Sequence, residues 1–151
     1  MEKTALAYLA GFFDGEGTIC ICKRANRNSF TLRIAIGQME RAPLVLFENA
    51  FGGRIHQLKR GARSDMLQWN LMVRDQQIGF LRMMLPYLRS KRREAEIALA
   101  FLENTAKIGF GGFQAKRHPE LLVEREELHR LCKEAKVIKD WRKPTTSMVK
   151  L

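Results

Sequence analysis

Hydrophobic and polar residues alternate along four stretches of the chain, a pattern that is typical of β-strands with one buried face. In one stretch, for example, Phe30, Leu32, Ile34 and Ile36 fall on the same side. The predicted strands are 18–24 and 30–36, then 54–59 and 66–73, with turns at 25–29 and 60–65. Two consecutive hairpins predict an antiparallel sheet.

Between and after these strands, apolar residues recur at the three- to four-residue spacing of a helix face. Pro43 and Pro119 stand where the first turn of a helix tolerates proline, and Gly52-Gly53 ends the helix that begins at Pro43. The predicted helices are 4–14, 43–51, 75–88, 91–106 and 119–135. This order predicts an α+β fold, an αββαββα core with further C-terminal helices, in which helices cover one face of the sheet and leave the other open.

The first predicted helix, 4–14, is apolar on nearly every side, so we expect it to be buried on every side. Gly15 and Gly17 are expected to end it. Its small residues Ala7, Ala10 and Gly11 would let the same helix of a second chain approach closely.

The length of 151 residues suits one domain, 1–140, followed by a basic tail, 141–151. The chain carries 27 Lys and Arg against 16 Asp and Glu, a formal net charge of +11. Residues 54–93 hold ten basic and two acidic side chains, interleaved with apolar ones, which favours a structured basic surface over a solvated run. Nucleic acid is therefore the expected partner. A membrane is not expected, because the longest uncharged run, Thr4–Phe13, has only ten residues.

Three cysteines, Cys20, Cys22 and Cys132, are too few for a disulfide framework. No cysteine or histidine pair has the spacing of zinc ligands. Glu2 and Lys3 precede the first apolar stretch, which does not fit a signal or transit peptide. We expect an intracellular protein, located within an organelle if the gene is organellar.

The open face of the predicted sheet combines basic and hydrogen-bonding side chains, which fits a DNA groove. The residues expected on this face are Arg24, Arg33, His56, Lys59, Gln68 and Asn70. Among the histidines, His56 is expected to touch DNA, and His118 and His129 are expected to be structural.

Asp14-Gly15-Glu16-Gly17 follows the first helix, where acids face the negative end of the helix dipole. A carboxylate together with helix-end carbonyls offers the hard oxygen ligands that Mg²⁺ prefers. The alternative is a turn with two solvated acids. One carboxylate per chain makes a poor site, but two chains packed through this helix would bring two copies of Glu16 together, as two-metal phosphodiester hydrolysis needs.

The segment Leu9-Ala-Gly-Phe-Phe-Asp-Gly-Glu-Gly17 resembles the motif that names the LAGLIDADG homing endonucleases. Pro86-Tyr-Leu-Arg-Ser-Lys91-Arg resembles the segment after the second hairpin in the single-motif, homodimeric subgroup, the I-CreI type. Arg142-Lys-Pro-Thr-Thr-Ser147 resembles the basic tail of that subgroup. The resemblance follows most of the chain in order.

This resemblance implies roles for individual residues. Glu16 would be the metal-binding acid, with the carbonyl of Gly15 as an accessory ligand. Lys91 matches a basic residue beside the scissile phosphates, and Gln38 matches a residue that positions water. Arg41 is the best match to a second basic residue, one position closer to Gln38 than expected. From the sequence alone, Lys91 could also be a plain phosphate contact, and Gln38 could merely precede the next helix.

The family further implies a homodimer in which Asp14 braces the helix pair formed through Ala7, Ala10 and Gly11. Mg²⁺ is the expected cofactor; Mn²⁺ should substitute, and Ca²⁺ should support binding only. The residues expected to contact DNA are Cys20, Cys22, Arg24, Asn26, Asn28, Thr31, Arg33, Ala35, His56, Lys59, Arg60, Arg63, Gln68, Asn70, Arg92 and Lys143.

The function implied is site-specific, metal-dependent cutting of both strands of a long pseudo-palindromic DNA target, which promotes the mobility of a host intron. Two alternatives share the fold. One is a maturase that binds intron RNA, and the other is a DNA-binding protein without catalysis.

Overall fold

The structure of the chain, a computed structural model, describes residues 1–24, 29–60, 63–108 and 118–137. Its elements follow the predicted order. They are α1 (Lys3–Glu16), β1 (Gly17–Lys23), β2 (Phe30–Gln38), α2 (Arg41–Phe51), β3 (Arg54–Arg60), β4 (Arg63–Leu71), α3 (Arg74–Met84), α4 (Arg92–Ile108) and α6 (Pro119–Val137).

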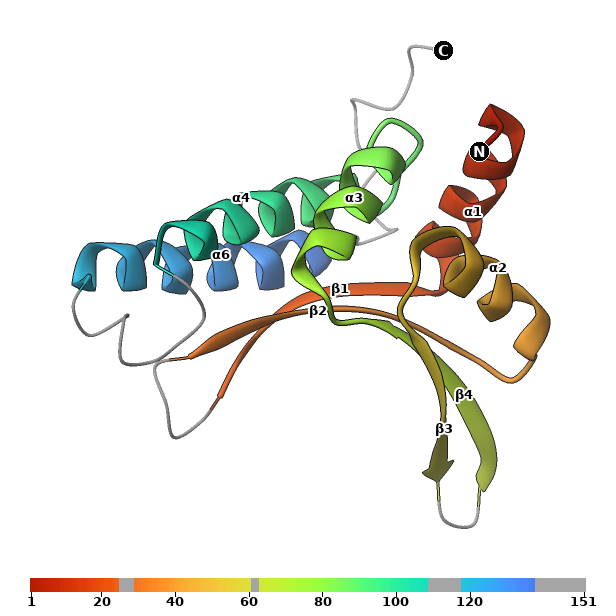
Figure 1. Cartoon of the computed structure of the whole chain (residues 1–151). Helices are drawn as coiled ribbons and strands as arrows, with labels where there is room; N and C mark the ends of the chain where they lie inside the picture. Colours follow the sequence, from red (N-terminus) through yellow and green to blue (C-terminus); the bar gives the residue numbers. More distant parts are fainter. Residues whose placement is uncertain (25–28, 61–62, 109–117, 138–151) are drawn as a thin grey trace.

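The strands form one antiparallel sheet in the order β1-β2-β4-β3, so the two hairpins join through β2 and β4. All the described helices lie on one side of this sheet (Figure 1). The two hairpins bend away from the helices, so the sheet forms an arch whose other side is open (Figure 1). The predicted α+β fold with a helix layer and an open, saddle-shaped face is confirmed.

Alternation along the strands decides which side chains are buried. Ile19, Ile21, Leu32, Ile34 and Ile36 are all 5 % exposed or less, on the face that the helices cover. Each such side chain removes apolar surface from water and contributes about 1.5–3 kcal/mol to folding.

An aromatic cluster fixes the helices over the second hairpin. Trp69 is fully buried, and its ring centroid lies 5.3 Å from that of Phe47 in α2 and 5.8 Å from that of Phe80 in α3. The ring of Phe80 also meets Phe13 of α1 at 5.0 Å, edge to face. Ring contacts thus hold α2 and α3 against β4, and they hold α1 against α3.

The join between the hairpins is completed by a buried amide. Gln77 of α3 is 3 % exposed, and its Nε2 donates to the carbonyls of Leu71 (2.8 Å) and Leu32 (3.2 Å). These carbonyls lie where β2 and β4 diverge, at the end of their pairing. Because α3 supplies the missing donor, the sheet splays there without leaving two unsatisfied buried acceptors.

Two glycines turn the chain from α2 into β3. Gly52 and Gly53 have φ angles of +76° and +85°, in the region that favours glycine. The indole Nε1 of Trp69 donates to the Gly52 carbonyl at 2.8 Å. A Cβ on Gly53 would lie 2.6 Å from the carbonyl oxygen of Asn70, so the turn and the strand are closely packed.

Several predicted boundaries were wrong. Helix α1 continues through Gly15 and Glu16, and Gly17 alone ends it. The second hairpin turn is shorter than 60–65, because β3 reaches Arg60 and β4 begins at Arg63. In the described residues, no helix is long and apolar enough to span a membrane.

Candidate active site and nucleic-acid interface

The C-terminal end of α1 is held against the start of α4 by the side chain of Asp14. Its Oδ2 accepts the amide N–H of Arg89 at 2.7 Å, and its Oδ1 accepts the amide N–H of Lys91 at 2.9 Å. In return, the ammonium group of Lys91 donates to the main-chain carbonyl of Asp14. The carboxylate therefore caps the chain entering α4, and the lysine places a positive charge at the negative end of α1.

These contacts place Lys91 at the end of α1 that also carries Glu16. Glu16, the last residue of the helix, is exposed, and so is Gly15. The ammonium of Lys91 is bound to the main-chain carbonyl of Asp14, which lies two residues before Glu16 in the chain. An exposed carboxylate beside backbone carbonyls fits a hard divalent cation that keeps several waters. The described residues contain no group of three or more His, Cys, Asp or Glu that could hold a metal ion.

Gln38 and Arg41 lie at the neighbouring end of β2. The register pairs Gly17 with Ile36, so the end of α1 lies beside the last residues of β2. The Oε1 of Gln38 accepts the amide of Met39 at 2.8 Å, a local bond just before α2. Arg41 is the first residue of α2 and is exposed. The register thus places the end of β2, with Gln38, beside the end of α1, and Arg41 follows three residues later; the catalytic roles of both residues stay predictions.

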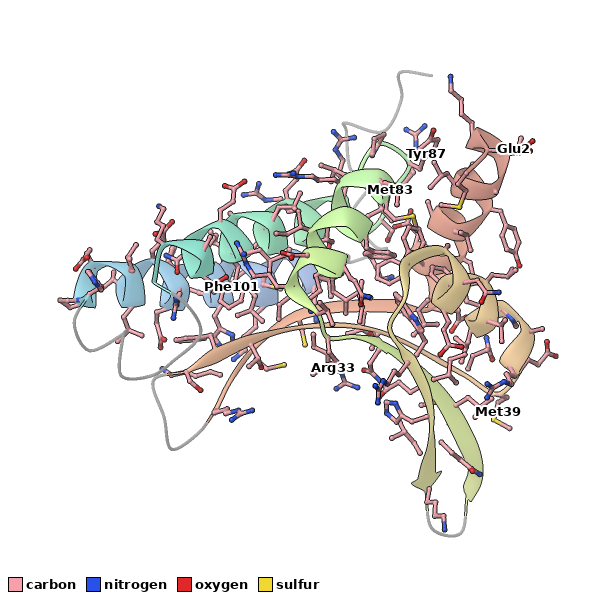
Figure 2. The ribbon with its side chains drawn as sticks, viewed as in Figure 1. Glu2, Arg33, Met39, Met83, Tyr87 and Phe101 are labelled. Carbon is pink, nitrogen blue, oxygen red and sulfur yellow. The ribbon has the colours of Figure 1, made fainter. Side chains whose placement is uncertain are left out.

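The register also defines the open face. Cys20 pairs with Arg33, Cys22 with Thr31, and His56 with Gln68, and all these side chains belong to the face away from the helices. Figure 2 shows Arg33 pointing from β2 to the side of the arch without helices. A hollow of about 730 Å³ lies on this face. Its lining includes Cys22, Arg24, Thr31, Arg33, Arg54, His56, Gln68, Asn70, Met72 and Val73.

The floor of the hollow is a hydrogen-bonded polar group, which we call the amide cluster: His56, Gln68 and Asn70. The Nδ2 of Asn70 donates to the Oε1 of Gln68 at 3.3 Å and lies 3.2 Å from the Nε2 of His56. Gln68 and Asn70 are each only 9 % exposed. Contact between side chains fixes their orientation before any ligand arrives, which reduces the entropy lost on binding.

Two predicted site residues are placed differently. Ala35 is 1 % exposed and Ala10 is fully buried, because each small side chain is covered within its own chain. Neither can touch DNA or a second chain as predicted. Lys59, expected beside His56, lies where the register of β3 and β4 shifts between Leu58 and Arg60. A β-bulge interrupts the alternation of side chains there, so the prediction for Lys59 stays a prediction.

Two cysteines lie side by side on β1. The Sγ atoms of Cys20 and Cys22 are 3.2 Å apart, and both side chains are partly buried. Burial and then the contact with Cys22 raise the pKa of the Cys20 thiol to about 11. Burial also raises the pKa of Cys132, whose Sγ lies under β1 at 3.9 Å from the Ile19 carbonyl. With its pKa raised, the Cys20 thiol stays protonated and uncharged near neutral pH, which does not suit the role of a nucleophile.

The remaining predicted contacts are placed at the edges. Arg24 is exposed at the end of β1, and Arg92 is exposed at the start of α4, where it pairs with Glu96 at 3.3 Å. Arg60 and Arg63 are strand residues of the second hairpin. Asn26, Asn28 and Lys143 lie outside the described residues.

The sequence reasoning missed part of the hollow. Arg54 lines it and pairs with Asn70 in the register, and alternation with His56 would have identified it. Met72 and Val73 were predicted to belong to a strand, but they follow β4 and are 73 % and 55 % exposed. Two large exposed apolar side chains in a row at the end of a strand were the available signal.

Comparison with known protein families finds no match, and neither does comparison with curated protein sequences. Solved structures do match. The homing endonuclease I-CvuI, in complex with its target in the presence of calcium, aligns with a TM-score of 0.68 and 21 % identity over 91 % of this chain and 83 % of that chain. The group I intron-encoded homing endonuclease I-CeuI, complexed with DNA, aligns with a TM-score of 0.70 and 19 % identity over 87 % of this chain and 67 % of that chain.

The LAGLIDADG meganuclease I-AabMI, bound to uncleaved DNA, gives a TM-score of 0.57 and 23 % identity over 68 % of this chain and 37 % of that one. The chain therefore has the fold of the LAGLIDADG homing endonucleases, as its first helix motif suggested.

Proposed function

We propose that the protein is a site-specific DNA endonuclease that acts as a homodimer and uses Mg²⁺. The observation that carries this proposal is the junction between α1 and α4, where the Lys91 ammonium donates to the main-chain carbonyl of Asp14, two residues before the exposed Glu16. A cation next to an open carboxylate suits a phosphodiester, because it offsets the charge that develops on the phosphate.

The open face supplies the surface for the substrate. An antiparallel ribbon fits the width of the major groove, and Arg24, Arg33 and Arg54 line the hollow on that face. Arginines at the rim can contact phosphates and give salt-dependent affinity, while strand side chains below them contact base edges. The net charge of +11 supports the same partner.

The cation would be held by the Glu16 carboxylate and the Gly15 carbonyl. Once bound, it would supply Lewis acidity and a more acidic bound water. The residues of the chain do the remaining work: Lys91 neutralises phosphate charge, and Gln38 and Arg41 at the end of β2 would orient water and the DNA strand. Pairing two chains through α1 would provide the second Glu16. The biological role that fits this activity is the spread of a host intron into alleles that lack it.

The test is cleavage of a bound pool. Random duplex DNA is enriched on the protein in Ca²⁺, Mg²⁺ or Mn²⁺ is then added, and new DNA ends are sequenced. We expect ends placed symmetrically about a pseudo-palindrome. Glu16→Gln should abolish them and keep binding, whereas Glu40→Gln, the same change at an exposed position before α2, should preserve cutting.

Enrichment without any cutting by the wild type would instead support a binding protein, with structured intron RNA as the next ligand to test. Cutting that survives Glu16→Gln would contradict the assignment of the metal-binding acid.

A further inference from the structure

We infer that the DNA site has an A·T base pair where it lies over the amide cluster, with Gln68 and Asn70 reading the adenine. This inference rests on the proposed function and adds the base to which one part of the open face is matched.

The hydrogen bonds within the cluster leave a defined pair of groups for a ligand. The Nδ2 of Asn70 is committed to the Oε1 of Gln68 and to the ring of His56. In the part of the chain that the structure describes, this leaves the side-chain Oδ1 of Asn70 as an acceptor and the side-chain Nε2 of Gln68 as a donor. A neighbouring acceptor and donor are held on the floor of one hollow.

Adenine matches this pair better than the other bases. In the major groove it presents N7, an acceptor, next to the N6 amino group, a donor. Guanine presents two acceptors there, so its O6, an acceptor, would face the side-chain Oδ1 of Asn70, which is also an acceptor. Cytosine offers a donor without an adjacent acceptor, and thymine offers an acceptor and a methyl group. Adenine is the one base that satisfies both Asn70 and Gln68 by itself, whereas a C·G pair offers a donor beside an acceptor only from two bases, the N4 of cytosine and the O6 of guanine.

The surroundings of the cluster support the same base pair. The register places Ala35 opposite Asn70 and Gly37 opposite Gln68, so β2 adds no large side chain beside the amides. The space at Gly37 is filled by the side chain of Met66 from β4. Met72 and Val73 give the same hollow an exposed apolar end. Apolar side chains contact the C5-methyl group of thymine, the partner of adenine.

The arginines of the hollow do not compete for this base. Arg33 and Arg54 are exposed, and a guanidinium group has donors only. These arginines suit guanine or phosphate at neighbouring base-pair steps. Neither arginine can accept the hydrogen bond from the adenine N6 amino group that Asn70 accepts.

The experiment compares bound sequences from random duplex DNA, enriched in Ca²⁺, for three proteins. Wild type should enrich adenine over guanine by about 5- to 150-fold at one symmetric pair of positions. Gln68→Glu replaces the donor by an acceptor and should shift those positions towards cytosine, whose N4 amino group a carboxylate accepts. Gln57→Glu is the matched control, because it makes the same change on the opposite face of β3 and should leave the preference unchanged.

Gln68→Ala provides a second, uncharged variant, which should flatten the preference at the same positions and no others. Circular dichroism and thermal melting establish that each variant is folded. If wild type selects a site in which the positions altered by the Gln68 variants are not adenine, or if no position responds to them, this inference is overturned while the proposed function stands. If wild type enriches no duplex at all, the proposed function fails and this inference falls with it.

Discussion

Asp14 and Lys91 bind each other through two hydrogen bonds, although 77 positions separate them in the sequence. The carboxylate of Asp14 accepts the Lys91 amide, the Lys91 ammonium donates to the Asp14 carbonyl, and the second carboxylate oxygen accepts the Arg89 amide. Because the same two residues join α1 to the start of α4 at the helix end that carries Glu16, the proposed site depends on a contact that also stabilises the fold.

Asp14→Asn should therefore weaken folding and activity together. The amide keeps one acceptor oxygen, but its NH₂ group faces an N–H donor, so we expect a loss of about 1.5–3 kcal/mol in the free energy of unfolding. Urea denaturation measures it. Asp75→Asn is the control, since that side chain is 91 % exposed on α3 and should cost less than about 1 kcal/mol. Equal effects of the two substitutions would contradict the bracing role of Asp14.

Gly53→Ala should be among the most damaging small substitutions in the chain. Its φ of +85° disfavours an L side chain, and the added Cβ would lie 2.6 Å from the Asn70 carbonyl oxygen and 2.7 Å from the Trp69 Nε1. We expect a loss of 3 kcal/mol or more, roughly what combined strain and overpacking cost, in thermal or urea unfolding. In Gly79→Ala, the added Cβ meets no atom within 4 Å in the interior of α3, so this substitution should instead stabilise by about 0.5–1 kcal/mol.

Local pattern predicted most of the fold because one physical rule, alternation over a single buried face, acts residue by residue. Ile19, Ile34 and Trp69 are buried for the reason that placed them on apolar strand faces. The rule failed where a contact came from elsewhere in the chain. The sequence around Gln77 says nothing about the two strand carbonyls that its amide reaches, 45 and 6 positions away.

The candidate site shows the same division. The motif around Glu16 indicated where the chemistry lies, and alternation indicated the open face. Neither could show that Ala35 is covered or that Asn70 and Gln68 bind each other, since both facts depend on packing across strands. Alternation also does not assign Lys59 to a face, because the register of β3 and β4 shifts between Leu58 and Arg60.

The raised pKa of Cys20 predicts slow thiol chemistry at the floor of the open face. The ordinary value is 9.0 and the folded value is about 11, so at pH 8 the thiolate fraction should be about 100-fold lower than for an unperturbed thiol. We expect alkylation of Cys20 by iodoacetamide, followed by mass spectrometry, to be slowed by that factor in the folded chain and restored in urea.

The same shift has a consequence for stability. The charged form is disfavoured in the folded state, so this contribution to the free energy of unfolding is complete below pH 9 and is lost as the pH rises through 11. Cys22→Ser removes the contact that adds to burial and should bring the Cys20 pKa back towards its ordinary value. Rapid alkylation of Cys20 at pH 8 in the folded wild type would refute the shift.

Among the residues that the structure describes, nothing covers one face of α1. Only Leu9, Ala10 and Phe13 of this apolar helix are buried, whereas Ala7 and Gly11 are exposed. Tyr8 on the same helix is 56 % exposed. The prediction that α1 is buried on every side is wrong for one chain, and it would hold only if another surface covered this face. A second copy of α1 would do so and would also bring the second Glu16.

Gly11→Glu tests this directly. A Cβ at Gly11 meets no atom within 4 Å, so the chain should fold as before, but a charge would be placed where two helices must approach. We expect sedimentation equilibrium to give two chains of 17.5 kDa for wild type and one for the variant, with unchanged circular dichroism. Ala42→Glu, at an exposed position on α2, should remain dimeric. A wild type that cuts DNA as a monomer would show that α1 does not build the active site by pairing.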